Sequence, residues 1–429
     1  MNRQHPTGAK GRASEAASLS TYCVLTLLFS PTSVNIAERD QMDFSLTDDQ
    51  QSICDAVQKA CAPFNDEYWL ARDRTGDFPV DFHRMMADGG WLGIAMPEQY
   101  GGAGLGVTEA ALLMHTVANS AGAMSAASAI HMNIFGPHPI VVFGSEEQKQ
   151  RWLPDLIRGS SKACFGVTEA DAGLDTTSIK TFATRTDDGY EIHGKKVWTS
   201  TAQEADKIML LTRTTPKEEC ERATDGLTLF FTDLARAYCE IKSIPKMGRA
   251  AVDSCEVFLD GLPARVEDRI GEEGRGFECL LHSLNPERIL IAAEAIGIGR
   301  NALTRASQYA KERVVFGRPI GQNQGVQHPL AQSWIDLEAA WLMTLRAASL
   351  YDSGEPCGVE ANAAKYLAGE AGFQSCTRAV MTHGGMGYAK EFHVERLLRE
   401  VIIARLAPIS PQLILCHIAE KALGLPKSY

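Results

Sequence analysis

The spacing of apolar residues changes twice along this chain, which limits the folds that the chain can adopt. Between residues 42 and 161 apolar side chains recur every three or four positions, the period of helices with one buried face. Between 162 and 272 short β-rich runs such as GLTLFFTDL alternate with turn residues. From 273 to 429 the helical period returns. The sequence therefore predicts an α+β multidomain fold, with an N-terminal all-α domain, a middle β-barrel or sandwich domain and a C-terminal helical bundle.

Composition excludes several classes of function. A chain of 429 residues can hold two or three domains at roughly 150 residues each. Its 42 basic and 53 acidic residues give a formal net charge of −11 and form no basic stripe, so nucleic acid is not an expected partner. Its 11 cysteines form no CxxC pair, which favours reduced thiols over zinc ligands or disulfides. We expect no metal site and a cytoplasmic location, or the mitochondrial matrix in a eukaryote.

Residues 1–41 differ in composition and apolar spacing from the rest of the chain. They hold basic and small polar residues and the apolar run TYCVLTLLF, which is too short to span a bilayer. This run has the character of a targeting segment, but the acidic residues around it count against a transit peptide. The alternative is a native start at Met42, with Ser45 as the N-cap of the first helix. We expect residues 1–41 to be an extension that the folded domains do not need, and no association with membranes.

Two segments of the middle region have the composition of a cofactor site. FGVTEADAGLDTTS (165–178) joins the helical region to the β region, and its small residues and Thr168 offer N–H groups and a hydroxyl to a phosphate or a ring. In KVWTST, Trp198 and Ser200 share one face of a strand and can flank a flat cofactor. A tight interdomain loop and ordinary core packing are the alternative explanations.

Glycine-rich runs occur at two further places. YGGAGLG (100–106) fits no GxGxxG frame and follows no strand, so it predicts a loop and not a dinucleotide site. In THGGMGY (382–388), Gly384 and Gly385 would let the backbone come close to an anion, although a helix C-cap explains them equally well. His383 beside them is expected to be a packed histidine.

The order of these segments resembles the acyl-CoA dehydrogenase family. GWLGIAMPEQYGGAGLG, VTEADAGLD, KVWTS, PERILIAAEAIGIG, RVVFGRPIGQNQ and HGGMGY follow one another across nearly all of residues 42–429. The resemblance implies an N-terminal helical domain (42–161), a middle β domain (162–272) and a C-terminal four-helix bundle (273–429). It also implies FAD held at a subunit interface of a homotetramer or homodimer. The implied reaction is α,β-dehydrogenation of an acyl-CoA thioester to the trans-2-enoyl-CoA, in fatty or branched acyl catabolism, with an electron-transfer flavoprotein as acceptor.

The resemblance also assigns the residues that would contact the cofactor and the substrate. The flavin ring would lie against the segment from Phe165 and against the end of KVWTS, and Arg313 would pair with the pyrophosphate of FAD in the neighbouring subunit. At two positions this chain departs from the family, with Leu174 where Ser is common and Met381 where Gln is common. The cofactor set is Phe165, Val167, Thr168, Trp198, Thr199, Ser200, Arg313, Phe316, Asn323, Gln324, Met381, Gly384, Gly385, Ser410 and Gln412, and the substrate set is Asn285 and Leu174.

The catalytic base of many family members is missing from its usual position. Where those members carry Glu-Gly-Thr, this chain has Pro408, Ile409 and Ser410. Proline can neither accept a proton there nor donate a backbone N–H to the thioester carbonyl. Two contributions to catalysis are therefore absent at one residue.

Isovaleryl-type and long-chain members carry the base elsewhere, and that position is Glu287 here. Arg288 would tune or orient its carboxylate. Asn285, Pro286 and Glu287 would also suit the start of a helix, in which case Glu287 is only an early acid. If the helix already runs from about Gly276, Pro286 bends it and Glu287 points from the bend.

The sequence predicts an FAD-dependent acyl-CoA dehydrogenase with Glu287 as base. One alternative is enoyl-CoA reduction, or oxidation of a substrate that is not a thioester, on the same fold. The other is an FAD-binding partner subunit without turnover. The small residues of NSAGAMSAASAI would leave room for a bulky or branched acyl group.

Overall fold

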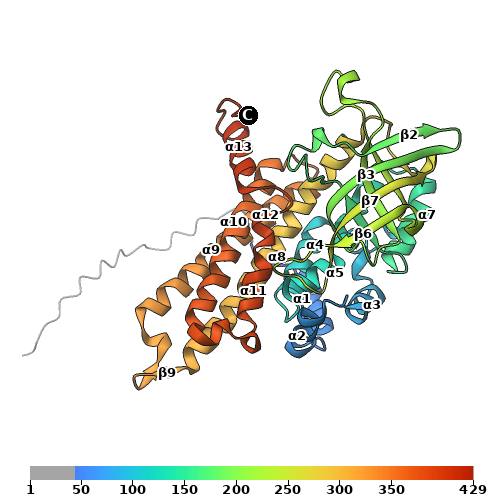
Figure 1. Cartoon of the computed structure of the whole chain (residues 1–429). Coiled ribbons are helices and arrows are strands. Elements are labelled where there is room, and N and C mark those ends of the chain that lie inside the picture. Colours follow the sequence, from blue (N-terminus) through green and yellow to red (C-terminus); the bar gives the residue numbers. More distant parts are fainter. Residues whose placement is uncertain (1–43, 429) are drawn as a thin grey trace, which may run out of the picture. The chain divides into compact units, whose positions relative to one another are not determined.

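The structure, a computed structural model, describes residues 44–428, and the predicted extension 1–41 lies outside this range. Helices form the first part of the described chain (Figure 1). They are α1 (Asp48–Cys61), α2 (Asp66–Thr75), α3 (Val80–Asp88), α4 (Val107–Ala118), α5 (Ala123–Phe135), α6 (His138–Phe143) and α7 (Glu146–Ile157). Every residue of α5 is buried, which is typical of a helix at the centre of a core.

The first helix starts two residues later than predicted. Thr47 is its N-cap, and its Oγ1 accepts a hydrogen bond from the backbone N–H of Gln50 at 3.2 Å. The Gln50 side chain accepts one in return from the Thr47 N–H, also at 3.2 Å. The assignment of Ser45 as N-cap was wrong because Thr47 and Gln50 complete a reciprocal capping box.

The middle region forms one eight-stranded sheet. Its strands are β1 (Ala163–Gly166), β2 (Phe182–Thr186), β3 (Gly189–Ser200), β4 (Lys207–Arg213), β5 (Leu227–Asp233), β6 (Cys239–Ser243), β7 (Ser254–Ala264) and β8 (Arg269–Ile270). They run in the order β6-β7-β3-β2-β4-β5-β8, with β1 parallel to β4. Alternate residues of β4 and β5 enter two different cores, so these strands are apolar on both faces.

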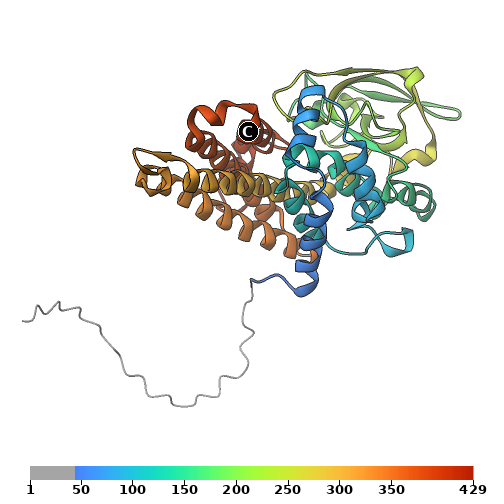
Figure 2. The same cartoon turned by 90° about the horizontal axis from the view of Figure 1, so that it is seen from below.

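The C-terminal region consists of helices again. They are α8 (Gly276–Glu312), α9 (Gln324–Asp352), α10 (Gly358–His383), α11 (Val394–Val401), α12 (Ile403–Leu406) and α13 (Pro411–Lys421), and a small hairpin, β9 (Val314–Val315) and β10 (Arg318–Pro319), follows α8. Figure 2 shows α8 and α9 running alongside each other. Helices α8 and α10 approach closely at Gly372, which has no side chain. A Cβ added there would lie 2.5 Å from the Ala295 carbonyl oxygen. The predicted succession of helical, β and helical domains is confirmed.

Within residues 44–428 no single helix is long and apolar enough to cross a membrane, although the bent pair Val394–Leu406 and Pro411–Lys421 reaches that length and composition together. In the same part of the chain no group of three or more His, Cys, Asp or Glu side chains is placed to hold a metal ion.

Candidate active site

Glu287 lies inside a long helix and not at its start. Helix α8 begins at Gly276 and continues without interruption through Pro286. The reading of Asn285 as the cap of a new helix was therefore wrong. Proline has no N–H, so one hydrogen bond of the helix is lost immediately before Glu287.

The surroundings of Glu287 bring its carboxyl group close to neutrality. The pKa of Glu287 is raised to about 7, mainly by burial, and the charge of Glu294 acts in the same direction. His131, Arg288 and Lys365 oppose this shift with their positive charges. A general base works best when its pKa lies near the working pH, so the site suits proton transfer.

Arg288 is not hydrogen-bonded to the neighbouring carboxylate. Its Nη1 donates to Asn285 Oδ1 at 2.9 Å, one turn earlier on α8. Its Nε is buried and has no hydrogen-bond partner among the described residues. Arg288 thus acts on Glu287 through its charge.

A buried histidine–carboxylate pair lies on the same face of α8 as Glu287. Glu294 follows Glu287 by two helical turns, which places both on one side of the helix. Its Oε1 lies 2.6 Å from Nδ1 of His131 on α5. Burial alone would lower the pKa of His131, but the carboxylates of Glu294 and Glu287 outweigh it and raise the pKa.

The end of β3 carries an exposed aromatic ring on a strained backbone. Trp198 has φ 61° and is 58% exposed. It lies at an irregularity where the pairing of β3 with β7 shifts between Lys196 and Thr199. Thr199 is fully buried, and its hydroxyl has no partner among the described residues. Ser200 pairs with Ser254 across the two strands.

The loop that follows β1 is fixed to this end of β3. The buried Lys196 Nζ donates to Glu169 Oε1 at 2.8 Å and to the Val167 carbonyl at 3.1 Å. The backbone N–H of Val197 donates to the Thr168 carbonyl at 2.9 Å. The structure therefore brings together two segments that were predicted separately as cofactor contacts.

Phe165 and Leu174 differ in their surroundings. The Phe165 ring lies 5.4 Å from the ring of Phe135, which in turn lies 4.9 Å from that of His131. Phe165 thus connects β1 with the polar face of α5. Leu174 is 52% exposed on the loop.

A buried lysine holds the segment that contains Pro408. Lys365 on α10 donates from Nζ to the carbonyls of Ile409 at 2.7 Å and Arg405 at 3.2 Å. It is 2% exposed, and burial lowers its pKa to about 8. The carbonyls of this segment thus face a cation, and the segment offers no carboxylate toward Glu287.

The residues after Pro408 begin the last helix. Ser410 is the N-cap of α13, and its Oγ accepts from the Leu413 N–H at 3.4 Å. Gln412 is exposed in the first turn. The Ser410 hydroxyl is therefore engaged within its own chain.

Family models match three successive parts of the chain. They are the N-terminal domain of acyl-CoA dehydrogenase over residues 47–160, its middle domain over 164–262 and its C-terminal domain over 274–408. The chain belongs to the acyl-CoA dehydrogenase family.

Individual family members resemble the chain over most of its length. Acyl-CoA dehydrogenase FadE12 of Mycobacterium tuberculosis is 36% identical over 392 residues, which are 90% of this chain and 99% of FadE12. The caffeyl-CoA reductase-Etf complex subunit CarC of Acetobacterium woodii is 32% identical over 76% of this chain and 86% of its own. The structure of butyryl-CoA dehydrogenase from Megasphaera elsdenii superposes with a TM-score of 0.85 at 29% identity, over 90% of this chain and all of that one.

The other residues assigned from the family lie beyond the far end of α8. Arg313 follows this helix, and 26 residues at 1.5 Å per residue place it about 39 Å from Glu287. Figure 1 shows the adjoining hairpin β9 at the end of the C-terminal helices away from β3. Within one chain the two groups cannot contact the same flavin ring. This second group contains Arg313, Phe316, Asn323, Gln324, Met381, Gly384 and Gly385.

Several residues of this second group are open to solvent and could therefore contact a cofactor. Phe316 is fully exposed and has φ 53°. Met381 is 75% exposed. A Cβ added at Gly384 or Gly385 would meet nothing within 4 Å. Asn323 instead accepts a hydrogen bond from Arg318 at 2.6 Å.

Sequence reasoning missed His131 and Glu294, whose charges act on Glu287, and Arg249, whose charge acts on His131. The first two are polar residues in otherwise apolar helices, ASAIHMNIF and IAAEAIGIG, and this interruption is the signal that could have found them. Arg249, in the loop between β6 and β7, gave no such signal.

Proposed function

We propose that this acyl-CoA dehydrogenase uses Glu287 to remove the α-proton of its substrate. The observation that carries the proposal is a partly buried carboxyl group on the inner face of α8 with a pKa raised to about 7. Pro408 occupies the other family position and has no acidic group. Glu287 is the remaining carboxylate in a place assigned to the base.

The cofactor is FAD, and the residues present fit it. Trp198 presents an exposed ring, and Gly384 and Gly385 leave the backbone open. Thr199 holds a buried hydroxyl that has no partner among residues 44–428. FAD, when bound, accepts the hydride that leaves the β-carbon of the substrate. The segment from Phe165 to Thr168 and the end of β3 from Trp198 to Ser200 would hold the flavin ring. Arg313 would bind the pyrophosphate across a subunit boundary.

Several residues of this chain have separate roles in the proposed proton transfer. Ionised Glu287 takes the α-proton on a carboxylate oxygen. Burial keeps that carboxylate basic, while His131 and Lys365 limit the shift so that it is still ionised near neutral pH. The rate of proton removal should therefore rise as the pH rises through about 7.

We expect electron-transfer flavoprotein to be the electron acceptor and the assembly to be a homotetramer or homodimer. The acceptor is supported by CarC, whose name places it in a complex with Etf. The assembly is supported by the separation of Glu287 and Arg313, because one chain supplies only one half of each flavin site.

The direct test is anaerobic mixing of the FAD-loaded protein with a panel of acyl-CoAs. Bleaching of the flavin absorbance by at least one of them is expected. If acyl-CoAs do not reduce the flavin but enoyl-CoAs reoxidise the chemically reduced flavin, the protein is a reductase. This is the second candidate function, which CarC suggests. Tight acyl-CoA binding with no absorbance change in either direction would indicate a partner subunit without turnover.

A further inference from the structure

Arg249 lies on a strained loop between β6 and β7, and its side chain contacts both the helical and the β domain. Its φ is 56°, a left-handed conformation that is costly for a residue with a side chain. The Lys246 Nζ fixes it by donating to the Arg249 carbonyl at 2.8 Å. The guanidinium Nη1 donates to Ser128 Oγ at 3.0 Å, and Nη2 donates to Ser254 Oγ at 3.3 Å.

No carboxylate in residues 44–428 forms an ion pair with Arg249 within 4.0 Å, although three lie in electrostatic range. Each of the three has partners of its own. Glu294 pairs with His131 at 2.6 Å, Glu400 pairs with Arg396 at 3.2 Å, and Asp253 accepts a backbone N–H.

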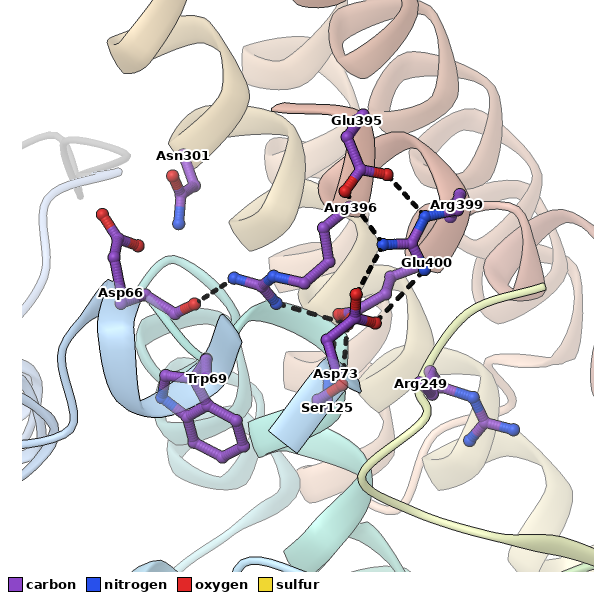
Figure 3. A network of polar contacts seen from close by, with 12 residues as sticks. Asp66, Trp69, Asp73, Ser125, Arg249, Asn301, Glu395, Arg396, Arg399 and Glu400 are labelled. Atoms are coloured by element: carbon purple, nitrogen blue, oxygen red, sulfur yellow. Dashed lines mark hydrogen bonds and ion pairs between the residues drawn. The ribbon is translucent and has the colours of Figure 1, made fainter. Parts of the chain in front are cut away.

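Figure 3 shows the Arg249 guanidinium apart from the neighbouring ion network, without a contact to its labelled carboxylates. The half-buried Arg249 guanidinium donates only to hydroxyls among the described side chains, so it lacks the counter-ion that normally offsets desolvation.

The position of Arg249 connects it with the proposed reaction site. Ser254 is the strand partner of Ser200, a residue expected to contact the flavin. Ser128 lies one helical turn before His131 on α5, and the charge of His131 acts on Glu287. The guanidinium therefore lies between α5, which carries His131, and the end of β7 that pairs with the proposed flavin contact Ser200.

We propose that Arg249, together with Ser128, binds a carboxylate at the far end of the substrate's acyl group. This inference rests on the proposed acyl-CoA dehydrogenase function and names its substrate class, a dicarboxylic acyl-CoA monothioester. Guanidinium and carboxylate form two parallel charged hydrogen bonds. A hydroxyl that accepts from Arg249 retains its own hydrogen, so Ser128 can donate to the same ligand.

The test compares acyl-CoAs of equal chain length that end in a methyl group or a carboxylate. Calorimetric titration of the FAD-loaded protein should give a dissociation constant at least about 10-fold lower for the carboxylate form, as for one charged hydrogen bond. In R249M this ratio should fall to about one, whereas R249K should keep part of it. The matched control R222M removes an exposed arginine of the same domain and should leave the ratio unchanged.

Equal affinities in the unchanged protein, or a preference that persists in folded R249M, would overturn the assignment. Flavin absorbance recorded on the same samples reports reduction separately from binding, so this result is distinct from a failure of Glu287 to act as base. Flavin reduction by the methyl-ended compound alone would support the proposed dehydrogenation and refute the role of Arg249. Thermal midpoints of R249M and R249K establish that the variants are folded.

Discussion

Two groups of buried and half-buried charges lie near each other in this protein and differ in how completely they are paired. In the closed network, made of Ser125, Arg396 and Glu400, the carboxylate accepts from Arg396 Nη1 at 3.2 Å and from the Ser125 N–H and hydroxyl at 3.0 and 2.7 Å (Figure 3). Figure 3 also shows Arg399 of the same helix paired with Asp73, which joins α11 to the N-terminal helices.

In the open cluster, made of Arg249, His131, Glu287 and Glu294, only the His131–Glu294 pair is in direct contact. Glu287 and Arg249 lack an ion-pair partner within 4.0 Å among the described residues. Complete pairing serves the fold, because a buried charge needs an opposite charge. Incomplete pairing leaves charges available to a ligand, which is typical of a functional site.

The largest effect is expected in the closed network. R396M would leave Glu400 buried without its cation, and both side chains are at most 1% exposed. The expected loss is about 3–5 kcal/mol of the free energy of unfolding, measured by denaturant titration. R346M removes the exposed pair with Glu360 and should cost no more than about 1 kcal/mol. Equal stabilities of the two variants would remove the distinction between the groups.

In the open cluster E287Q should affect the reaction and leave the fold intact. Gln keeps the size and an acceptor oxygen of Glu but cannot take a proton at neutral pH. Flavin reduction by a good acyl-CoA, followed by anaerobic stopped-flow absorbance, should slow by roughly 100-fold or more.

E278Q, on an exposed face of the same helix, should react at the normal rate. P408E added to E287Q should not restore the lost rate, because a carboxylate there need not face the same proton. If E287Q reduces its flavin at a near-normal rate, the base lies elsewhere.

Arg313 is a solvent-exposed cation, and we expect it, like Arg249 in the open cluster, to bind an anionic group. Its expected ligand is the pyrophosphate of FAD in a neighbouring subunit. R313A should weaken FAD binding by about 1.5–3 kcal/mol, the range for a charged hydrogen bond. FAD retention and assembly should fail together, which size-exclusion chromatography with flavin absorbance will detect. Stoichiometric FAD on a monomer would contradict this expectation.

The smallest effect sharpens the link between His131 and Glu287. The charge of His131 lowers the pKa of Glu287, so H131N should raise that pKa above its value of about 7. Because only the ionised form accepts a proton, the midpoint of the pH–rate profile should move to higher pH, by up to about one pH unit. H193N changes an exposed histidine of the β domain and should leave the midpoint in place. A midpoint at lower pH in H131N would reverse the sign of the proposed coupling.

Much of the fold could be predicted because it depends on local patterns. The alternation in β3 and the three-to-four spacing of the helices reflect which faces are buried, and this is written directly into the order of residues. The start of α8 was left open because Asn285 and Pro286 form a good local signal for a helix start. Contacts from Gly276 onward override that signal, and the helix continues through the proline.

The role of a site residue could be predicted only where the covalent structure of its side chain decides that role. That Pro408 cannot be a base follows from its covalent structure and needs no fold. The pairing of His131 with Glu294 joins residues 163 positions apart, and Arg249 meets Ser128 across 121 positions. No local pattern contains such contacts.

The sequence by itself determined the succession of helical, β and helical domains and the absence of an acid at position 408. Only the tertiary structure decided the electrostatic state of the site. The pKa of Glu287 depends on burial and on charges that other helices bring near it. Within the described residues Arg249 forms no ion pair because the neighbouring carboxylates bond to other groups. Electrostatic interactions depend on distance in space, and separation along the chain does not set that distance.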